Sequence, residues 1–481
     1  MTNFEESNYI KPDKQFRKWD SELSVQDATD KKLEKLGFSY NDSDKLVLNH
    51  TKFVQYVMTR VDALNNNEKI YFYNQKSQCY ELLTKEKYQR IFLYIIEEVS
   101  DDIWKKKLEN EYLPYFQRKV PYSEDNGMKA GLLHFTNCIV DLEEDGYYDH
   151  SPKIFSLVQI PYAFDENAKA PKFMQFLNEI FEGDKERIAV IQEIMGACLY
   201  YTDVVQKLFI FLGNGSNGKS LLANIIKKML GGERNVSAIA LDQFSGNRFS
   251  RQNLDRKLLN ISSETKTEKL YSTADLKTLT GGDSVEIEEK FEKSYTTKIY
   301  SKFILLANDM IQTKDYSDGF YRRLLIVPFN VCFHDLAPDE EPKESIHYKN
   351  PNLEKELEEE LSGIFNFAYD GLLRLSDNGY AFSYSSACEK ALEHYKNEHN
   401  VVKAFYNECI AIYEASAKMK TKKTEVFQAF KIYCNRNNFH NTFSSTLFYR
   451  LLQAILDEEE TGVYQKHLNS GDYFKNLAVE I

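Results

Sequence analysis

The stretch FLGNGSNGKSLLANIIKKML, residues 211–230, decides the fold because it joins the end of an apolar run to a glycine-rich loop. Gly213, Gly218, Lys219 and Ser220 fit the pattern G-x-x-x-x-G-K-[S/T], which binds phosphates when a strand precedes it and a helix follows. KLFIFL supplies the strand and SLLANIIKKML the helix. We therefore predict a phosphate-binding loop in an α/β core, with a purely structural glycine turn as the alternative.

The residue types of this loop suit the phosphates of ATP and a magnesium ion. Glycines let backbone N–H groups turn towards phosphates, and the following helix places the positive end of its dipole there. Lys219 would reach the β and γ phosphates, and the Ser220 hydroxyl would bind Mg²⁺. The predicted ATP-binding residues are Gly213, Asn214, Gly215, Ser216, Asn217, Gly218, Lys219 and Ser220.

Short apolar runs between residues 207 and 330 predict a central, mostly parallel sheet, whose carboxyl strand ends share one edge. LLNIS brings Ser263 and Glu264 to that edge, and KFILLAN brings Asn308. We predict that Glu264 activates water and assists Mg²⁺ through a water molecule. Asn308 would orient the attacking water or sense the γ phosphate. A solvated glutamate and an ordinary turn asparagine are the alternatives.

Arg322 and Arg323 stand directly before the apolar run LLIVPF. An arginine placed before a sheet-edge strand can reach the nucleotide of a neighbouring subunit and stabilise charge in the transition state. The alternative is a surface pair that forms salt bridges.

The runs SVEIE and SYTTKIY alternate in polarity and flank the tip EKFEK, which predicts a β-hairpin. The tip carries Lys290, Phe291 and Lys293, so it offers cations for phosphates and an aromatic face for a base or sugar. A charged tip that is merely solvated is the alternative.

The composition bounds the class of protein. A chain of 481 residues predicts two to four domains, and no apolar run approaches the ~18–20 residues of a membrane span. The start lacks the basic-then-apolar order of a signal peptide, so we expect a soluble, cytoplasmic protein. The net charge of −12 argues against a nucleic-acid binder that works through its whole surface, but not against a local basic channel. The seven cysteines lack zinc-ligand spacing and are expected to be reduced core residues.

The chain is divided by its patterning into five segments. We predict an N-terminal α+β unit, a segment of strands and helices, the α/β core, a helical continuation and a C-terminal unit that runs helix, helix, hairpin. Their predicted bounds are 1–125, 126–205, 206–335, 336–412 and 413–481.

The order of GNGSNGKS, ISSE, the TGGD hairpin with its KF tip, LLAND and FYRRLLIVPF resembles the superfamily 3 helicases, in particular their phage, plasmid and poxvirus primase-helicase branch. LLHFTNCIVDL is similar to that branch's upstream strand, and APKFMQFLNEIFEGDKE with IQEIMGACLYY to its helical collar. EKELEEELSGIFNFAYDGLLRL resembles a helix that follows the core. The resemblance covers about residues 126–410.

This resemblance implies an AAA+ core, assembled as a homo-hexameric ring that draws single-stranded DNA through its centre. Lys219 and Ser220 would be the Walker A pair, Glu264 the Walker B carboxylate, Asn308 sensor 1, and Arg323 the arginine finger acting on a neighbour, with Arg322 as its substitute. Lys290 and Phe291 would lie on the pore hairpin. A short basic tip repeated around a ring lines a positive pore while the outer surface stays acidic.

Some residues depart from the family pattern. Ser263 stands where a second acidic residue is common, Cys138 replaces a glycine, and NDMIQ lacks a proline after sensor 1. Relatives often carry a primase domain, whose chemistry needs closely spaced carboxylates for two metals. Asp141 and Glu143 belong to the family's strand instead, so we do not expect primer synthesis unless the N-terminal unit carries a divergent form of such a domain.

The order helix, helix, hairpin at the C-terminus fits a winged helix, which this family often carries. FSSTLFYRLLQAIL would then be its recognition helix in a major groove of double-stranded origin DNA. Lys431, Arg450 and Lys466 are the predicted DNA contacts. A winged helix that serves only protein packing is the alternative.

We thus predict an ATP-driven replicative helicase of a phage or mobile element, self-loading at an origin. One alternative is an origin-binding initiator whose ATPase mainly drives ring assembly. The other is a P-loop ATPase that does not act on DNA.

Overall fold

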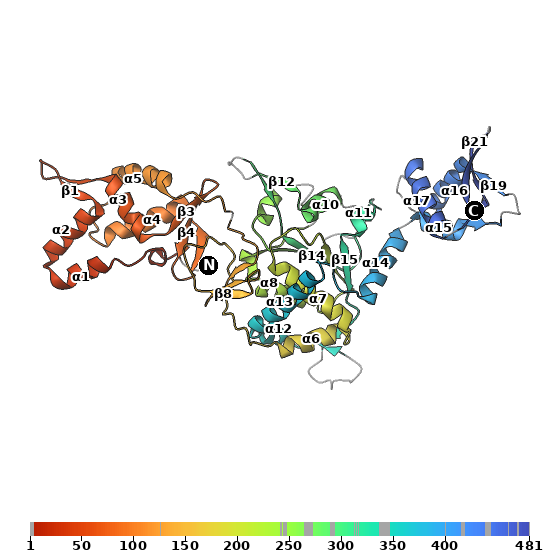
Figure 1. Cartoon of the computed structure of the whole chain (residues 1–481), viewed down its shortest axis with the longest axis horizontal. Helices are drawn as coiled ribbons and strands as arrows, with labels where there is room; N and C mark the ends of the chain where they lie inside the picture. The colour runs from red at the N-terminus through yellow and green to blue at the C-terminus, as the bar shows by residue number, and fades with distance from the viewer. Residues whose placement is uncertain are drawn as a thin grey trace.

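The computed structural model describes residues 4–125, 127–240, 243, 248–263, 273–288, 294–311, 313, 315, 317–335, 347–399, 401–414, 419–437, 444–459, 461–468 and 471–480. An N-terminal unit, a central α/β core and a C-terminal unit follow one another along the long axis (Figure 1). None of the helices within these ranges is both long and apolar enough to cross a membrane.

The N-terminal unit is α+β, as the sequence predicts. Its helices pack around a core of large rings that includes Phe53, Phe92 and Tyr112, all with almost no exposed surface. Ser24 caps one helix by accepting a hydrogen bond from the Asp27 N–H. The elements are η1 (Glu6–Tyr9), α1 (Lys14–Glu22), α2 (Val25–Leu36), β1 (Phe38–Tyr40), β2 (Leu46–Leu48), α3 (His50–Arg60), β3 (Ala63–Asn66), β4 (Lys69–Asn74), β5 (Cys79–Leu82), α4 (Lys85–Glu97) and α5 (Lys106–Lys119). Strands β1 and β2 pair with each other, while β3, β4 and β5 form an antiparallel sheet.

The segment before the core has three antiparallel strands and two helices. The sequence predicts strands and helices here, and the last of the strands, β8, is short and largely exposed. Asp184 caps the second helix through the Glu186 and Arg187 N–H groups. The elements are β6 (Leu132–His134), β7 (Ile139–Asp141), β8 (Gly146–Tyr148), α6 (Pro171–Phe181) and α7 (Lys185–Leu199).

The core is a five-stranded, entirely parallel sheet with the order β10-β11-β14-β9-β15. Its strands are near-continuous apolar runs because side chains on both faces are buried. The four runs quoted from the sequence are confirmed as strands, and the two-residue β10 is an addition. The bounds are β9 (Leu208–Leu212), β10 (Val236–Ser237), β11 (Leu259–Ser263), β14 (Lys302–Ala307) and β15 (Leu324–Pro328), with α8 (Lys219–Met229), η2 (Gly232–Arg234) and η3 (Arg248–Leu254) between them.

The predicted hairpin is confirmed as the antiparallel pair β12 (Ser284–Ile287) and β13 (Tyr295–Lys298). It follows α10 (Thr273–Gly281) and returns the chain to the start of β14. A short helix, α11 (Asp318–Tyr321), lies between β14 and β15.

Helices that follow the core return to the helices that precede it. Gly196 of α7 lies so close to α13 that a Cβ atom there would be 2.4 Å from the Leu372 nitrogen, and one on Gly371 would be 2.2 Å from the Gln192 oxygen. Glycine is required where two helix backbones approach this closely. These later elements are β16 (Phe333–His334), β17 (His347–Tyr348), α12 (Leu353–Glu358), α13 (Leu361–Asp377) and α14 (Ser386–His399).

The C-terminal unit has its own apolar core, which includes Phe405, Phe430, Phe448 and Phe474. The predicted order of helix, helix and hairpin is confirmed by α16 (Lys423–Arg436), α17 (Ser445–Glu458), β20 (Tyr464–Leu468) and β21 (Gly471–Lys475). The remaining elements are α15 (Val401–Cys409), β18 (Ile410–Ile412), β19 (Lys420–Lys422) and β22 (Leu477–Val479). Helix α15 ends at Cys409, because the Ile-Ala-Ile run that follows it pairs with β22.

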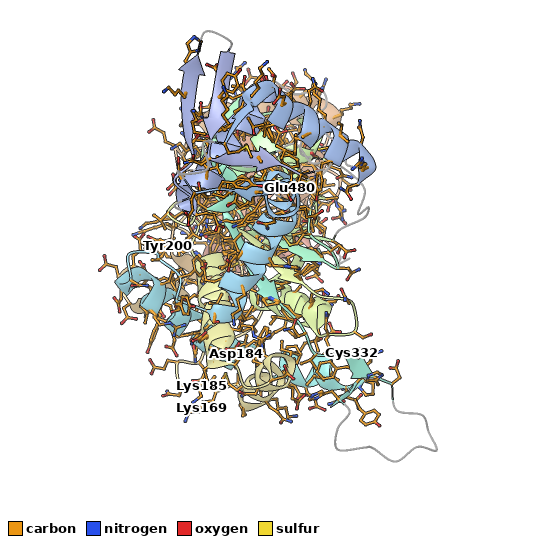
Figure 2. The ribbon with its side chains drawn as sticks, turned by 90° about the vertical axis from the view of Figure 1, so that its right-hand side faces the viewer. Lys169, Asp184, Lys185, Tyr200, Cys332 and Glu480 are labelled. Carbon is orange, nitrogen blue, oxygen red and sulfur yellow. The ribbon has the colours of Figure 1, made fainter. Side chains whose placement is uncertain are left out.

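All seven cysteines are free thiols. Six are buried, as predicted, but Cys332 is exposed and lies on the surface of the core (Figure 2). The expectation that every cysteine is a core residue is therefore wrong at this position, which lies four residues after the end of β15 at Pro328.

Candidate nucleotide site and its surroundings

The predicted phosphate loop lies at the edge of the sheet where the carboxyl ends of the strands meet. The Gly213 N–H donates to the Ala307 oxygen over 3.1 Å, and the Phe329 N–H donates to the Leu212 oxygen over 2.7 Å. These bonds continue the pairing of β9 with β14 and β15 into the loop. A cavity of about 800 Å³ opens beside residues 215–220, a size typical of small-molecule sites.

Two glycines of the motif are fixed by close contacts. A Cβ atom on Gly213 would lie 2.4 Å from both the Phe329 oxygen and the Asn217 Nδ2, and one on Gly218 would lie 2.7 Å from Ile180 Cγ2. Gly215 and Gly218 also have φ angles of 89° and 85°, and Ser216 shares this left-handed region at 46°. Gly213 and Gly218 therefore cannot carry a side chain without a shift of their neighbours.

Lys219 begins α8 and is 5% exposed. Its ammonium donates to the Gly213 carbonyl oxygen and, over 3.2 Å, to Asn217 Oδ1. Burial lowers the pKa of this ammonium. Both acceptors are neutral oxygens of the loop. A bound anion such as a phosphate could replace them as the partner of this buried ammonium.

Ser220, by contrast, is exposed and lines the cavity. Its hydroxyl therefore fits the role of a Mg²⁺ ligand beside a bound triphosphate. Within the part of the chain that the structure describes, no group of three or more His, Cys, Asp or Glu side chains could hold a metal ion.

The two other predicted strand ends reach the same cavity. Ser263 at the end of β11 and Asn308 after β14 both line it. Asn308 also lines a second cavity of about 610 Å³ on the other side of the loop, so its exposed amide stands between the two spaces. Glu264, the predicted base, directly follows Ser263 and lies outside the described residues.

One wall of the cavity was not predicted. The segment after β15 crosses the loop, where the Phe333 N–H donates to the Ser216 oxygen over 2.7 Å. Its strands β16 and β17 bring Tyr348 to the cavity, and Lys349 forms an ion pair with Asp335 at 2.8 Å. Phe176 and Glu179 of α6 line the cavity as well. These strands are two residues long, so the sequence gives no periodic signal for them.

Arg322 and Arg323 do not belong to this cavity. Leu324, the first residue of β15, pairs with Leu208 at the start of β9, whereas the phosphate loop follows the end of β9. The arginines therefore lie at the opposite edge of the sheet. Arg322 is exposed, while the half-buried Arg323 donates to the Gly319 oxygen. Burial, with the neighbouring Arg322 charge, lowers the pKa of Arg323.

The hairpin tip with Lys290, Phe291 and Lys293 lies outside the described residues, but both strands that lead to it are described. The Tyr295 hydroxyl of β13 donates to Asp255 over 3.0 Å, and the Lys69 ammonium lies 6.0 Å from the centre of the Tyr295 ring. The guanidinium of Arg256, the residue after Asp255, donates to Asn66 Oδ1 over 2.8 Å. Because Tyr295 pairs with Ile287 at the end of the strands nearest the tip, the tip-side end of the hairpin is joined to the N-terminal unit.

The three predicted DNA contacts of the C-terminal unit are all exposed. Lys431 of α16 lies 4.7 Å from the centre of the Phe427 ring, Arg450 projects from α17, and Lys466 belongs to β20. The helices and the hairpin are held together around Lys423, which lies 4.5 Å from the Tyr449 ring and donates to Gln465 over 2.9 Å.

Comparison with known families gives two matches. Residues 53–182 match the family described as "D5 N terminal like", and residues 211–323 match a family of unknown function, DUF5906. The second match runs from the end of β9 through the phosphate loop to Arg323.

Several viral proteins described as "Putative helicase" are similar to the chain. The protein of Acanthamoeba polyphaga mimivirus is 25% identical over 298 residues, covering 60% of this chain and 29% of its own length. Those of Invertebrate iridescent viruses 3 and 6 are 24% and 22% identical and cover 44% and 58% of this chain, but only 24% and 32% of their own lengths. The chain thus spans no more than about a third of the viral proteins it matches.

Among solved structures, the apo C-terminal region of NrS-1 aligns with 87% of this chain and 96% of its own. The two chains are 14% identical, with a TM-score of 0.48.

Proposed function

The chain is a relative of the D5-type primase-helicases, as its motif order predicts, and on this premise we propose that it is an ATP-driven DNA helicase acting as a homo-hexameric ring. The observation that carries the proposal is the phosphate loop facing a cavity of about 800 Å³ at the edge where the strand ends meet. In this reading, a cytoplasmic replication protein of a phage or mobile element hydrolyses ATP to move along single-stranded DNA.

The cavity supplies the groups for hydrolysis. Lys219 would exchange its two loop acceptors for the β and γ phosphates, and Ser220 would hold Mg²⁺. Asn308, exposed between the two cavities, is suited to orient the attacking water. Glu264 is proposed as the base that accepts the proton from this water.

A ring is supported by the position of the two arginines. Transition-state charge on the γ phosphate needs a cation, but Arg322 and Arg323 lie at the far edge of their own sheet. A neighbouring subunit that sets this edge against the cavity would bring Arg323 to the phosphate, with Arg322 as its substitute.

The hairpin is proposed as the part that moves DNA. Lys290 and Lys293 would contact phosphates and Phe291 a base or sugar, in a pore lined by each subunit in turn. Because the strands β12 and β13 lead directly into β14, the hairpin and the sensor Asn308 stand on one continuous stretch of chain.

The C-terminal unit is proposed as a winged helix that binds double-stranded origin DNA through Lys431, Arg450 and Lys466. Its order of helices and hairpin and the exposure of all three cations favour this function.

An initiator whose ATPase mainly assembles the ring is the second candidate, and the same three exposed cations favour it.

The first test is steady-state ATPase with and without single-stranded DNA, beside unwinding of a forked duplex. Wild type should be stimulated by DNA and open the fork. Lys290→Ala should keep ATPase and lose unwinding, whereas Lys298→Ala, an exposed lysine at the base of the same hairpin, should keep both. An ATPase that ignores DNA and opens no fork would exclude the helicase; binding to origin DNA would then identify the initiator.

A further inference from the structure

Helix α10 and the segment before α11 are joined by a compact polar network. Asp315 Oδ2 accepts a hydrogen bond from the Thr273 hydroxyl over 2.5 Å and forms an ion pair with the Lys277 ammonium. Lys277 also donates to the Ser317 hydroxyl over 2.9 Å, and the Ser317 N–H donates to Asp315 Oδ1 over 3.0 Å. Two residues of α10 thus hold two residues that precede α11.

This network continues to the arginine pair. Ser317 caps α11 by accepting a hydrogen bond from the Phe320 N–H over 3.3 Å. The Arg322 N–H donates to the Asp318 oxygen over 2.9 Å, and the Arg323 guanidinium donates to the Gly319 oxygen. Helix α11 is only four residues long, so its N-cap Ser317 and the buried side chains of Phe320 and Tyr321 together fix its orientation.

Helix α10 occupies a particular place in the chain. It is the first helix of the described residues after Ser263, which lines the nucleotide cavity, and it leads into β12 of the hairpin. Asp275 of the same helix pairs with Arg251 at 2.7 Å, so α10 is also held from its other side. Helix α10 is thus held by Arg251 through Asp275, and it contacts the segment before α11 through Lys277 and Asp315.

We propose that Asp315 and Lys277 are positioning residues, which hold the arginine pair in the orientation it needs at the neighbouring subunit's nucleotide. The proposal rests on the proposed function of Arg323 as a finger acting in trans.

A purely stabilising role would have a different consequence. The side chains of Lys277 and Asp315 are 31% and 18% exposed, and a network that only stabilised the fold would, when broken, lower the free energy of unfolding but leave kcat unchanged. A displaced catalytic group, by contrast, can lower a rate about 100-fold. Asp315→Asn should therefore lower kcat about 100-fold, while ATP affinity and ring assembly stay within about twofold of wild type.

The decisive experiment mixes variant subunits and measures single-turnover ATP hydrolysis. A single turnover needs only one interface at which the lysine of one subunit and the arginine of the next are both intact, and it does not need hydrolysis at every interface of the ring. Lys219→Ala subunits lack their own hydrolysis but keep a normal arginine, whereas Arg323→Ala subunits have the reverse defect. Their mixture should hydrolyse ATP although each alone does not. Asp315→Asn should gain activity when mixed with Lys219→Ala and gain none when mixed with Arg323→Ala.

The controls separate the proposal from its premise. Asp62→Asn removes an ion pair with Lys11 of similar exposure, 39% and 21%, in the N-terminal unit and should leave hydrolysis unchanged. Lys277→Arg, which keeps the positive charge, should retain more activity than Lys277→Ala. If Lys219→Ala and Arg323→Ala fail to complement each other, the finger in trans is wrong. If they complement but Asp315→Asn behaves as wild type, or gains activity only with Arg323→Ala, Asp315 does not position the finger.

Discussion

The Lys219 ammonium donates a hydrogen bond to the carbonyl oxygen of Gly213, six residues earlier at the start of the same loop. A carbonyl of the loop thus accepts a hydrogen bond from the lysine of the same loop, and this contact gives the buried ammonium an acceptor. A triphosphate that enters the cavity would replace a neutral carbonyl by charged oxygens, which are stronger acceptors for an ammonium.

Lys219→Ala should lower ATP hydrolysis by at least about 100-fold, because the β and γ phosphates lose their charged partner. Steady-state phosphate release measures this loss. Lys227→Ala, near the other end of α8, removes only an exposed pair with Glu233 at 3.4 Å and should hydrolyse ATP as wild type. Normal hydrolysis by Lys219→Ala would place the nucleotide elsewhere.

Gly213→Ala should distort the loop, since its new methyl group would lie 2.4 Å from the Phe329 oxygen. We expect loss of nucleotide binding, measured with a fluorescent ATP analogue, and a Tm lower by several degrees, because overpacking costs about 1–3 kcal/mol. Gly146→Ala meets only one atom, at 3.8 Å, and provides the control. Equal ATP affinity in both variants would contradict the geometry assigned to the loop.

Arg323→Ala should bind ATP normally but hydrolyse it at least about 1,000-fold more slowly, as expected when an arginine finger is lost. Equilibrium binding and single-turnover hydrolysis together distinguish this pattern from that of Lys219→Ala. Arg322→Ala should show a smaller loss, because Arg322 is only the proposed substitute. Full activity of rings made of Arg323→Ala alone would refute the assignment.

His134 of β6 gives the protein a predictable sensitivity to acid. Its ring is 1% exposed and lies 5.9 Å from that of His150. Burial, aided by His150, lowers its pKa from 6.5 to about 4. Between these values the unfolded chain binds a proton that the folded chain excludes, so the free energy of unfolding should fall by up to about 3 kcal/mol as the pH drops.

Denaturant unfolding at pH 7 and pH 5 tests this prediction. Wild type should lose more stability on acidification than His134→Phe, which cannot titrate. His50→Phe, a change at an exposed histidine, should keep the wild-type dependence on pH. Equal slopes for wild type and His134→Phe would mean that the pKa of His134 is the same in the folded and the unfolded chain.

Salt dependence tests the DNA contacts of the C-terminal unit. If Lys431, Arg450 and Lys466 each contact a phosphate, replacing any one by Ala should reduce the slope of log K against log salt concentration by about one. Fluorescence anisotropy with double-stranded origin DNA measures it. Lys420→Ala, an exposed lysine of β19, serves as the comparison. Unchanged slopes in all three variants would favour a winged helix used for protein packing.

The sequence predicts the parts of the site in which the residues that carry the function also form the local structure. The loop 213–220, the runs that become β9, β11, β14 and β15, and the pairing of β12 with β13 each carry a contiguous pattern. Such patterns reflect neighbours along the chain, so they can be recognised without tertiary information.

The wall of the cavity could not be predicted because it arises from contacts between distant residues. β16 and β17 are two residues long and pair only because the segment after β15 crosses the loop at Ser216. The joint of Arg256 with Asn66 and the network of Asp315 with Lys277 likewise join polar residues far apart in the sequence. No periodicity marks such pairs.

The close approach of α7 and α13 has a consequence for how the chain is made. One face of the parallel sheet is covered by helices on both sides of it in the sequence, and Gly196 meets Leu372 only after the ribosome has passed the whole core. Until then, the newly made sheet exposes apolar side chains that favour aggregation. A fragment that ends at Pro328 should therefore be insoluble, whereas one that extends through Asp377 completes its own cover.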